Sequence, residues 1–201
     1  MSRDPEPRGS VTQKQAVAVC GPISAGKTTI VQVLATKYHW DIVSFGDHVR
    51  NVARMRALPA TRITWQRLGL QLLTELGPAR FVHEVLAASK PGSAVHLYDG
   101  PRQVGLLVEL DRLYDQLVII YLDVPRIERY ARWVIRQRPG DPVGTLEEFD
   151  RISVEQIERD VPAIRLMAHS VINVGLSIAD LLERIELLLT ERGYPLHPDW
   201  R

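Results

Sequence analysis

The chain has 201 residues, of which 24% are charged and 45% hydrophobic, and its formal net charge is +1. This length fits one domain with a sizeable core, which excludes a small scaffold that depends on metals or disulfides. The balanced charge argues against a nucleic-acid-binding domain, and no apolar run is long enough to span a membrane. Because Cys20 is the single cysteine and the chain does not start with a secretory signal pattern, we expect a cytoplasmic protein with no nucleic-acid or membrane partner.

Short β-branched runs alternate with amphipathic stretches along most of the chain, after a polar segment at residues 1–13 that we expect to be a disordered leader. This alternation predicts an α/β fold, with a parallel sheet covered by helices on both faces. One domain should span residues 14–193, followed by a C-terminal tail at 194–201. Strands are predicted at residues 16–20, 41–45, 94–98, 117–122 and 170–174, and helices at 27–38, 104–114, 125–136 and 178–192.

Two segments interrupt this alternation. Residues 50–89 contain two helical patterns, at 64–76 and 79–89, separated by Gly77-Pro78. Residues 137–145 carry two prolines and two glycines, a density typical of a loop. We therefore expect a helical insertion at the first place and a loop at the second.

A phosphate-binding pattern follows the first predicted strand. Residues 21–28 read Gly-Pro-Ile-Ser-Ala-Gly-Lys-Thr and match G-x-x-x-x-G-K-[ST], between a strand and a helix whose N-terminus favours anions. Lys27 would then reach the β- and γ-phosphates of a nucleotide, and the Thr28 hydroxyl would ligate Mg²⁺. We expect ATP and Mg²⁺ as cofactors. The expected nucleotide-binding residues are Gly21, Ser24, Ala25, Gly26, Lys27, Thr28 and Thr29.

Acids, glycines and arginines follow the second and third predicted strands. These segments are Gly46-Asp47-His48-Val49-Arg50 and Asp99-Gly100-Pro101-Arg102. Because the carboxyl ends of parallel strands meet at one edge of a sheet, both segments should lie beside the phosphate-binding loop. The planar guanidinium groups of Arg50 and Arg102 suit a phosphate, so we expect a small phosphate-bearing acceptor as the second ligand.

These motifs resemble those of the P-loop nucleoside monophosphate kinases and dephospho-coenzyme A kinases, over about residues 15–189. The similarity is greatest to a mainly archaeal group of uncharacterised nucleotide kinases. That group has an R-x-x-R-x-x-x-R-x-R run followed by an acid and by T-x-x-E-F. Here the run consists of Arg129, Arg132, Arg136 and Arg138, followed by Asp141 and then by Thr145, Glu148 and Phe149.

The resemblance implies a P-loop fold with five parallel strands in the order 2-3-1-4-5, an acceptor-binding helical segment at 50–89 and a short lid at 137–145. It implies Mg²⁺-dependent phosphoryl transfer from ATP to a nucleotide or nucleotide-like acceptor, by a monomer or homodimer. Asp99 would hold Mg²⁺ through water, and Asp47 would orient or deprotonate an acceptor hydroxyl. The implied catalytic residues are Lys27, Asp47, Arg132 and Arg136, and the implied acceptor-binding residues are Asp47, Arg50, Asp99 and Arg102.

Several of these residues have a purely structural alternative. Asp47 can be the N-cap of the next helix, and Asp99 with Arg102 can form a turn and a surface ion pair. Trp65 and the stripe at residues 64–76 can form the acceptor pocket, although we favour core packing for most of that stripe.

The helix predicted at residues 125–136 has an arginine face and an apolar face. The arginine face either binds ATP or is simply solvated. We expect the apolar face to pack on the sheet. The arginines are Arg126, Arg129, Arg132 and Arg136, and the apolar residues are Ile127, Tyr130, Ala131, Val134 and Ile135.

The sequence departs from adenylate kinases where those enzymes bind the base. The segment Asp99-Gly100-Pro101-Arg102 is one residue shorter, and Leu106 replaces their glutamine, so AMP is not carried over as the acceptor. An alternative function is an ATP-binding regulatory protein or slow NTPase that uses the lid as a switch without a small acceptor.

Overall fold

The computed structural model describes residues 14–136, 144–154, 158–173 and 177–196. The expected leader, residues 137–143 of the expected lid, Val174 of the last predicted strand and residues 197–201 of the expected tail lie outside the described residues.

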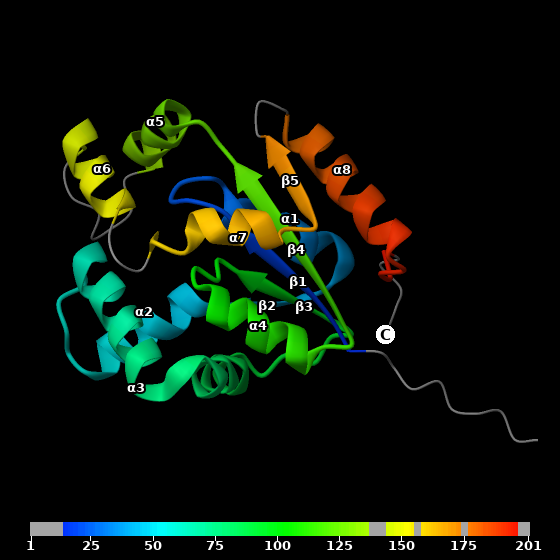
Figure 1. Cartoon of the computed structure of the whole chain (residues 1–201), viewed down its shortest axis with the longest axis horizontal. Coiled ribbons are helices and arrows are strands. Elements are labelled where there is room, and N and C mark those ends of the chain that lie inside the picture. Colours follow the sequence, from blue (N-terminus) through cyan, green and yellow to red (C-terminus); the bar gives the residue numbers. More distant parts are fainter. Residues whose placement is uncertain (1–13, 137–143, 155–157, 174–176, 197–201) are drawn as a thin grey trace, which may run out of the picture.

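Five parallel strands form one sheet in the order β2-β3-β1-β4-β5, as predicted (Figure 1). Every residue of the central strand β1 is buried, because strands pair with it on both sides and helices cover both faces. The predicted fold class is therefore confirmed. The strands are β1 (Gln15–Cys20), β2 (Asp41–Ser44), β3 (Val95–Asp99), β4 (Gln116–Asp123) and β5 (Ser170–Asn173).

Helices connect the strands and cover the sheet on both faces (Figure 1). Within the described ranges, no helix combines the length and apolar character needed to cross a membrane. The helices are α1 (Lys27–Tyr38), α2 (Phe45–Met55), α3 (Arg62–Ser89), α4 (Val104–Leu113), α5 (Arg126–Arg136), α6 (Leu146–Ser153), α7 (Val161–Met167) and α8 (Ile178–Glu191).

The hydrophobic core has two main layers, because alternate side chains of a strand point to opposite faces of the sheet. Ala16, Ala18 and Cys20 of β1 pack in the layer that contains side chains of α2, α3, α4 and α7. Val17 and Val19 pack in the layer that contains side chains of α1 and α8. The two layers fix the strand ends, and therefore the loops that follow them.

The chain passes directly from β2 into α2, although the sequence pattern predicts that Phe45 is still in the strand. Ser44 is the N-cap, and its hydroxyl accepts a hydrogen bond from the backbone N–H of Asp47 at 3.1 Å. Serine is among the residues that best stabilise a helix start. The prediction of Phe45 as a strand residue and the alternative of Asp47 as the N-cap are therefore both wrong. Asp47 lies in the first turn of α2 instead.

Two short helices that the sequence analysis did not predict lie between α5 and β5. Thr145 is the N-cap of α6 and accepts a hydrogen bond from the backbone N–H of Glu148 at 3.2 Å. Pro162 occupies the first turn of α7, a position that proline favours. Both starts carry a sequence signal, but α6 and α7 have only 8 and 7 residues, too few for a clear helical period.

Tyr194 belongs to the segment expected to be a tail, but it is buried against the first residues of two strands. Its hydroxyl donates to the carbonyl oxygen of Ala16 at 2.8 Å and to that of Gln116 at 3.2 Å. Its ring centroid lies 6.3 Å from that of Trp40. This contact lies at the amino ends of β1 and β4.

Helix α3 is interrupted at Gly77, as the Gly-Pro pair predicts. Gly77 has φ 72° and ψ 164°, a conformation open to glycine and to few other residues, and Pro78 follows it. Its missing side chain faces open space, because a Cβ there would meet no atom within 4 Å. Any effect of a substitution at Gly77 would therefore come from the backbone alone.

We expect Gly77→Ala to lower the free energy of unfolding by about 1–3 kcal/mol, the cost of holding alanine in this backbone conformation. For a chain of this size that corresponds to roughly 2–4 °C in Tm for each kcal/mol. Gly92→Ala is the matched control, because a Cβ there also meets open space and no positive φ is involved. Equal Tm values for Gly77→Ala and Gly92→Ala, measured by thermal unfolding, would contradict this account.

Candidate active site

The loop between β1 and α1 has the backbone shape that the phosphate-binding motif requires. Gly21, Ser24 and Gly26 have positive φ angles of 133°, 60° and 97°. At Gly21 a Cβ would lie 2.6 Å from the carbonyl oxygen of Leu122, so only glycine fits against β4. A turn of this kind directs successive backbone N–H groups toward one point at the start of α1.

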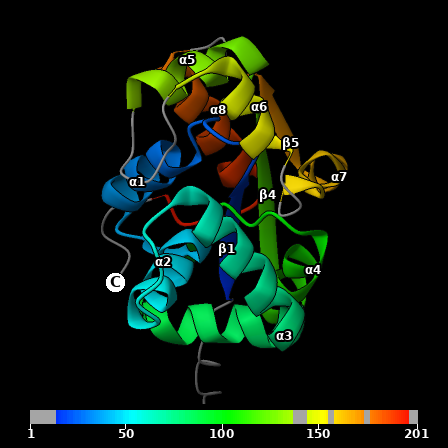
Figure 2. The same cartoon turned by 90° about the vertical axis from the view of Figure 1, so that its left-hand side faces the viewer.

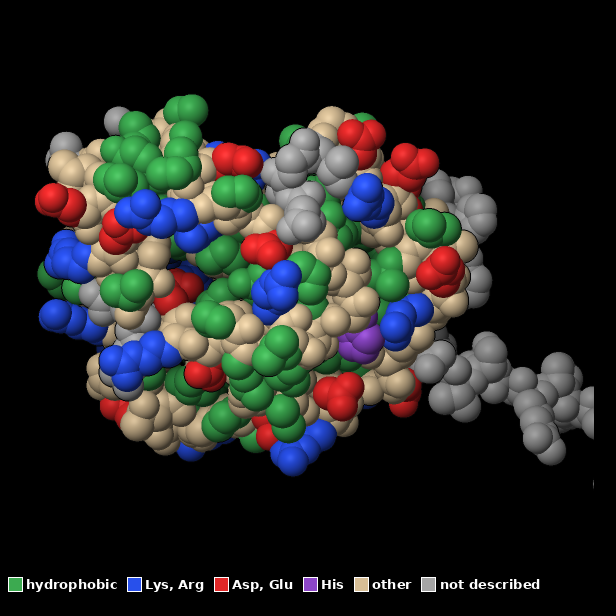
Figure 3. All heavy atoms as spheres, turned by 45° about the horizontal axis from the view of Figure 1, so that its top comes forward, with side chains coloured by type: hydrophobic (Ala, Val, Ile, Leu, Met, Phe, Trp, Pro, Cys, Tyr) green, Lys and Arg blue, Asp and Glu red, His purple; other side chains and the backbone are tan. Residues whose placement is uncertain are grey.

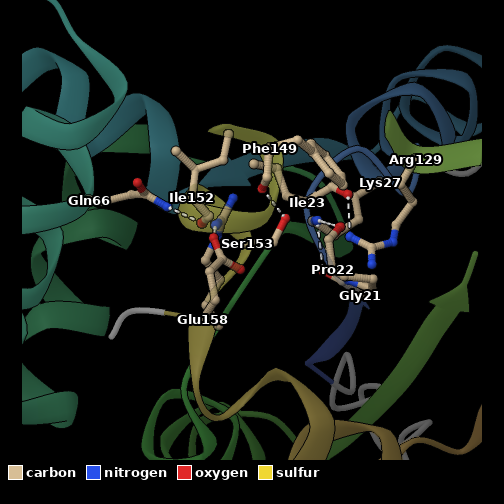
Figure 4. Close-up of polar contacts among 11 residues, drawn as sticks. Gly21, Pro22, Ile23, Lys27, Gln66, Arg129, Phe149, Ile152, Ser153 and Glu158 are labelled. Atoms are coloured by element: carbon tan, nitrogen blue, oxygen red, sulfur yellow. Dashed lines mark hydrogen bonds and ion pairs between the residues drawn. The ribbon is translucent and has the colours of Figure 1, made fainter. Parts of the chain in front are cut away.

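Lys27 is buried and bends back over its own loop. Its ammonium group donates to the carbonyl oxygens of Gly21 and Pro22, each at 2.8 Å (Figure 4). Burial and, to a smaller extent, the positive charge of Arg102 together lower the pKa of Lys27 to about 7, although the Asp99 carboxylate opposes this shift. Gly100, with φ +70°, lies in the loop after β3. Its lack of a side chain lets this loop pass close to Lys27, because a Cβ at Gly100 would lie 3.3 Å from Cε of Lys27.

Thr28 and Asp99 meet at the carboxyl ends of two neighbouring strands. β1 and β3 pair with Val19 opposite Asp99, and the Thr28 hydroxyl donates to the Asp99 carboxylate at 2.8 Å. A hydroxyl and a carboxylate are the hard oxygen ligands that suit Mg²⁺ with several of its waters retained. The two residues therefore fit the magnesium site expected from the sequence.

A cavity of about 350 Å³ opens beside this loop. Its lining residues include side chains of α2 and α3, which lie on one side of the strand ends in Figure 2, and of α5, which lies on the other. The phosphate-binding loop contributes residues 24–29 to its wall, and Asp99 and Gly100 follow from β3. The cavity thus adjoins the expected nucleotide site and the expected acceptor segment at once.

Positive side chains from four elements line this cavity. Arg50 comes from α2, Arg62 from α3, Arg102 from the segment after β3, and Arg132 and Arg136 from α5. Burial and, after it, the charge of Arg62 lower the pKa of Arg102 to about 9. The pKa values of Lys27 and Arg102 fall first because burial disfavours their charged forms, and second because other cations lie nearby, an environment that an anionic ligand would stabilise.

Arg102 has a buried partner that the sequence analysis missed. Its guanidinium group forms an ion pair with Glu158, which is only 5% exposed and lies in the turn before α7. In the same turn, the Asp160 carboxylate accepts a hydrogen bond from the backbone N–H of Val104 at 3.1 Å, at the start of α4. The turn before α7 therefore fixes both Arg102 and the helix that follows it. The alternative of a surface ion pair between Asp99 and Arg102 does not describe this geometry.

Helix α5 directs Arg132 and Arg136 toward the cavity, and the prediction that its apolar face packs on the sheet is wrong. Ile127 and Ile135 are 60% and 83% exposed, and Trp133 is the fully buried residue of the helix. Trp133 packs against Phe149 of α6, with ring centroids 5.6 Å apart. Figure 3 accordingly shows hydrophobic side chains gathered on the surface over the side where α5 lies. Because α5 projects beyond the strand ends, α6 and the phosphate-binding loop replace the sheet as its packing partners.

The arginines of α5 have two different roles. Arg129 donates to the carbonyl oxygen of Val124 at 3.1 Å. It also donates to the carbonyl oxygen of Ile23 at 3.4 Å, and so ties the helix to the loop (Figure 4). Arg126 pairs with Asp150 of α6 at the surface. Arg132 and Arg136, which the resemblance singles out, line the cavity instead, and Arg132 also lies 3.4 Å from the carbonyl oxygen of Ala25.

The structure does not place all the expected site residues on the cavity wall. Gly21 is the first residue of the loop and packs against β4, and the side chain of Asp47 is largely exposed. The Asp47 carboxylate accepts a hydrogen bond from Arg50 at 2.5 Å, one turn further along α2. Asp47 thus positions Arg50 here, and its role as a general base stays a prediction.

Several residues of the cavity wall are not found by motif analysis. Arg62 and Gln66 lie on the first turns of α3, and Trp65 between them also lines the cavity, which supports the pocket alternative for this part of the stripe. A helical spacing of three or four residues is the only signal that links them. Apolar residues complete the wall, namely Phe45, Val49, Phe81 and Leu106.

Comparisons with known proteins agree with this architecture. No family model and no curated protein sequence matches the chain. Among solved structures, shikimate kinase from Acinetobacter baumannii has a TM-score of 0.57 at 18% identity, with 90% of this chain and 96% of that chain covered. Deoxyadenosine kinase from M. mycoides with bound dCTP has a TM-score of 0.52 at 15% identity, with 88% and 100% covered. A sugar kinase from Janibacter has a TM-score of 0.50 at 19% identity, with 92% and 96% covered.

At such identities the likeness shows the fold alone, and that fold is the P-loop fold with five parallel strands that was predicted from the sequence. The neighbours named above are kinases of three different acceptors, so they do not select one for this chain. The comparisons give no support to the predicted similarity to a mainly archaeal group of nucleotide kinases.

We expect Glu158→Ala to lower the free energy of unfolding by about 1–3 kcal/mol, because it removes the partner of the half-buried Arg102 guanidinium, which lies near Arg62. Glu84→Ala is the control, since Glu84 pairs with Arg80 on the exposed surface of α3 and an exposed i,i+4 pair contributes only about 0.3–0.5 kcal/mol. Urea unfolding monitored by circular dichroism measures both values. Similar losses in the two variants would show that the Arg102–Glu158 pair is not a buried charge pair in solution.

Proposed function

We propose that this protein transfers the γ-phosphoryl group of ATP to a small phosphate-bearing acceptor, a nucleotide or a nucleotide-like molecule. One observation carries the proposal: a single cavity is lined both by the phosphate-binding loop and by arginines of the acceptor segment. Its volume of about 350 Å³ is in the range of small-molecule sites. A site that only binds or hydrolyses ATP does not need this additional space.

The ATP side of the site uses the loop and α5. The β- and γ-phosphates bind to the backbone N–H groups of residues 24–29 and to the Lys27 ammonium. To reach them, Lys27 gives up its hydrogen bonds to the carbonyl oxygens of Gly21 and Pro22. A smaller hollow of about 280 Å³, lined by Ile30, Arg132, Ile178 and Leu181 among others, adjoins the loop on the side of α8. It is mostly apolar, which suits the nucleoside part of ATP.

The acceptor side uses the arginines of α2, α3 and the segment after β3. Arg50 and Arg102 bind the acceptor phosphate, and Arg62 adds a third guanidinium group from α3. Thr28 and Asp99 would hold Mg²⁺, which would neutralise part of the phosphate charge. Arg132 and Arg136 stabilise the negative charge on the transferred group, because phosphoryl transfer depends on positioning and charge neutralisation.

We expect Lys27→Met to reduce acceptor-dependent ADP formation at least about 100-fold, the usual effect of removing one charge-stabilising donor. Lys37→Met is the matched control, because Lys37 lies on the same helix but is exposed and pairs with Glu186 at 2.6 Å. A coupled assay of ADP release with each variant gives the comparison. A Lys27→Met protein with the wild-type rate contradicts the proposal.

Arg132→Met and Arg136→Met should each lower kcat by about 10³-fold or more, the scale of a transition-state arginine, with a smaller change in KM for the acceptor. Arg126→Met serves as the control on the same helix, because Arg126 pairs with Asp150 away from the cavity. If all three variants have the same kcat, the cationic face of α5 does not act on the transferred group.

The acceptor is identified by measuring ADP release in the presence of nucleoside monophosphates, deoxynucleotides, dephospho-coenzyme A and shikimate. Stimulation by one of them supports the proposal and names the acceptor class. ATP binding without stimulation by any of them favours the alternative, a regulatory protein or slow NTPase.

A further inference from the structure

The outer face of α5 is apolar and open to solvent. Ile127 and Ile135 are 60% and 83% exposed, and Ala131, which lies between them, is exposed as well. Residues four positions apart lie on one face of a helix, so these three side chains form a stripe along α5. Figure 3 shows hydrophobic side chains gathered on this side of the molecule. We refer to Ile127, Ala131 and Ile135 as the α5 stripe.

The α5 stripe lies away from the contacts that hold the helix to the rest of the protein. The inner face makes those contacts: Trp133 packs against Phe149, and Arg129 donates to the carbonyl oxygen of Ile23. Single exposed apolar residues are common at protein surfaces, whereas an aligned set rimmed by charged residues is typical of an interaction site. Covering the stripe removes two large isoleucine side chains from water, which favours association.

The spacing of the stripe indicates a second copy of this chain as the partner. Ile127 lies four residues before Ala131 and Ile135 lies four residues after it, so the stripe is the same in both chain directions. A copy of α5 related by a two-fold axis at Ala131 therefore places each Ile127 against Ile135 of the other copy. One patch then serves both partners, as in most homodimers. The small side chain of Ala131 at the axis lets the two helices approach closely.

The charges beside the stripe fit the same arrangement. Glu128 and Arg132 each follow a stripe residue by one position and so lie along one edge of it, with Oε2 and Nη2 3.6 Å apart. Both side chains are close to half exposed. In an antiparallel helix pair the same edges meet in reversed direction, so Glu128 of each copy comes beside Arg132 of the other. The face is thus complementary to itself in charge as well as in shape.

Arg132 can take part in this contact and still line the cavity, because its two terminal nitrogens point to different places. Nη1 lies 3.4 Å from the carbonyl oxygen of Ala25 in the phosphate-binding loop. Nη2 lies on the side of Glu128, at the edge of the stripe. A partner at the stripe therefore does not have to occupy the cavity.

We propose that the α5 stripe is the contact surface of a homodimer, in which two copies of α5 pack antiparallel about a two-fold axis at Ala131. A single helix pair covers less than the about 800 Å² per partner of a standard interface, so we expect a weak dimer with a Kd of about 10–100 µM. This inference concerns the surface outside the cavity and does not rest on the proposed function.

Sedimentation velocity of the full chain tests the dimer, over concentrations from about 1 to 500 µM that bracket the expected Kd. We expect the mass to rise from 22.8 kDa toward twice that value. Ile135→Glu should weaken the dimer at least about tenfold, because it places a charge in the apolar contact. Leu187→Glu is the matched control, since Leu187 is 61% exposed on α8 and lies outside the stripe.

Two results of this experiment overturn the proposal. One is a wild-type protein that stays monomeric at the highest concentration. The other is a dimer that Ile135→Glu weakens no more than Leu187→Glu does, because the contact then lies on another surface.

A cross-link tests the two-fold axis directly. Ala131→Cys places two thiols at the axis, so diamide should oxidise them to a disulfide between the copies, which gives a dimer band on non-reducing gels. Cys20 is fully buried and does not compete. Leu187→Cys is the control, because its thiols lie apart in the proposed dimer. Equal rates of cross-linking in the two variants overturn the antiparallel arrangement.

Exchange of the two edge charges tests the direction of the helices. Glu128→Arg should weaken the dimer, because it brings like charges together, and Glu128→Arg combined with Arg132→Glu should restore it. Both are measured by sedimentation, so the result does not depend on activity. A double variant that is no tighter than Glu128→Arg alone contradicts the proposed pairing of these edges.

Discussion

The repulsion between neighbouring cations is the constraint on which the rest of this site depends. Lys27 begins α1, Arg102 follows β3, and Arg62 lies near both on α3. Like charges in a space of low dielectric raise each other's energy unless anions or dipoles compensate. The fold supplies this compensation in pieces: two loop carbonyls hold Lys27, and Glu158 holds Arg102. The groups that we propose to bind phosphate are thus held in place by the protein's own carbonyl and carboxylate groups.

This compensation explains why segments far apart in the sequence must fold together. The turn that carries Glu158 also caps α4 through Asp160, and α6 receives the amide of Gln66 at its last turn. Arg129 links α5 to the phosphate-binding loop, and Trp133 packs α5 on α6. The turn before α7 and helix α6 therefore support the residues that line the cavity.

The motifs allowed most of the fold and half of the site to be predicted, because local physics decides them. A glycine-rich turn between a strand and a helix has one common geometry, so residues 24–29 reach the cavity as expected. Arg50, Asp99 and Arg102 were found because strand ends in a parallel sheet converge. The partner of Arg102 and the place of Gln66 in the cavity wall were not predictable, since Glu158 and Gln66 act through tertiary contacts that leave no local pattern. The prediction for α5 was wrong for the same reason. Its apolar residues indicated packing on the sheet, whereas its packing partner is α6.

The recess that holds these arginines also limits which anions they attract. Charges at a protein surface are screened by salt over about 8 Å under physiological conditions, and the chain as a whole carries a formal net charge of only +1. Long-range steering of polyanions is therefore weak, and attraction becomes strong only at the mouth of the cavity. A duplex or a lipid surface is too large to enter it, whereas a single phosphate ester is not. The same arginines spread over an open face would attract polyanions without selection, so the depth of the cavity acts as a filter on ligand size before any specific contact is made.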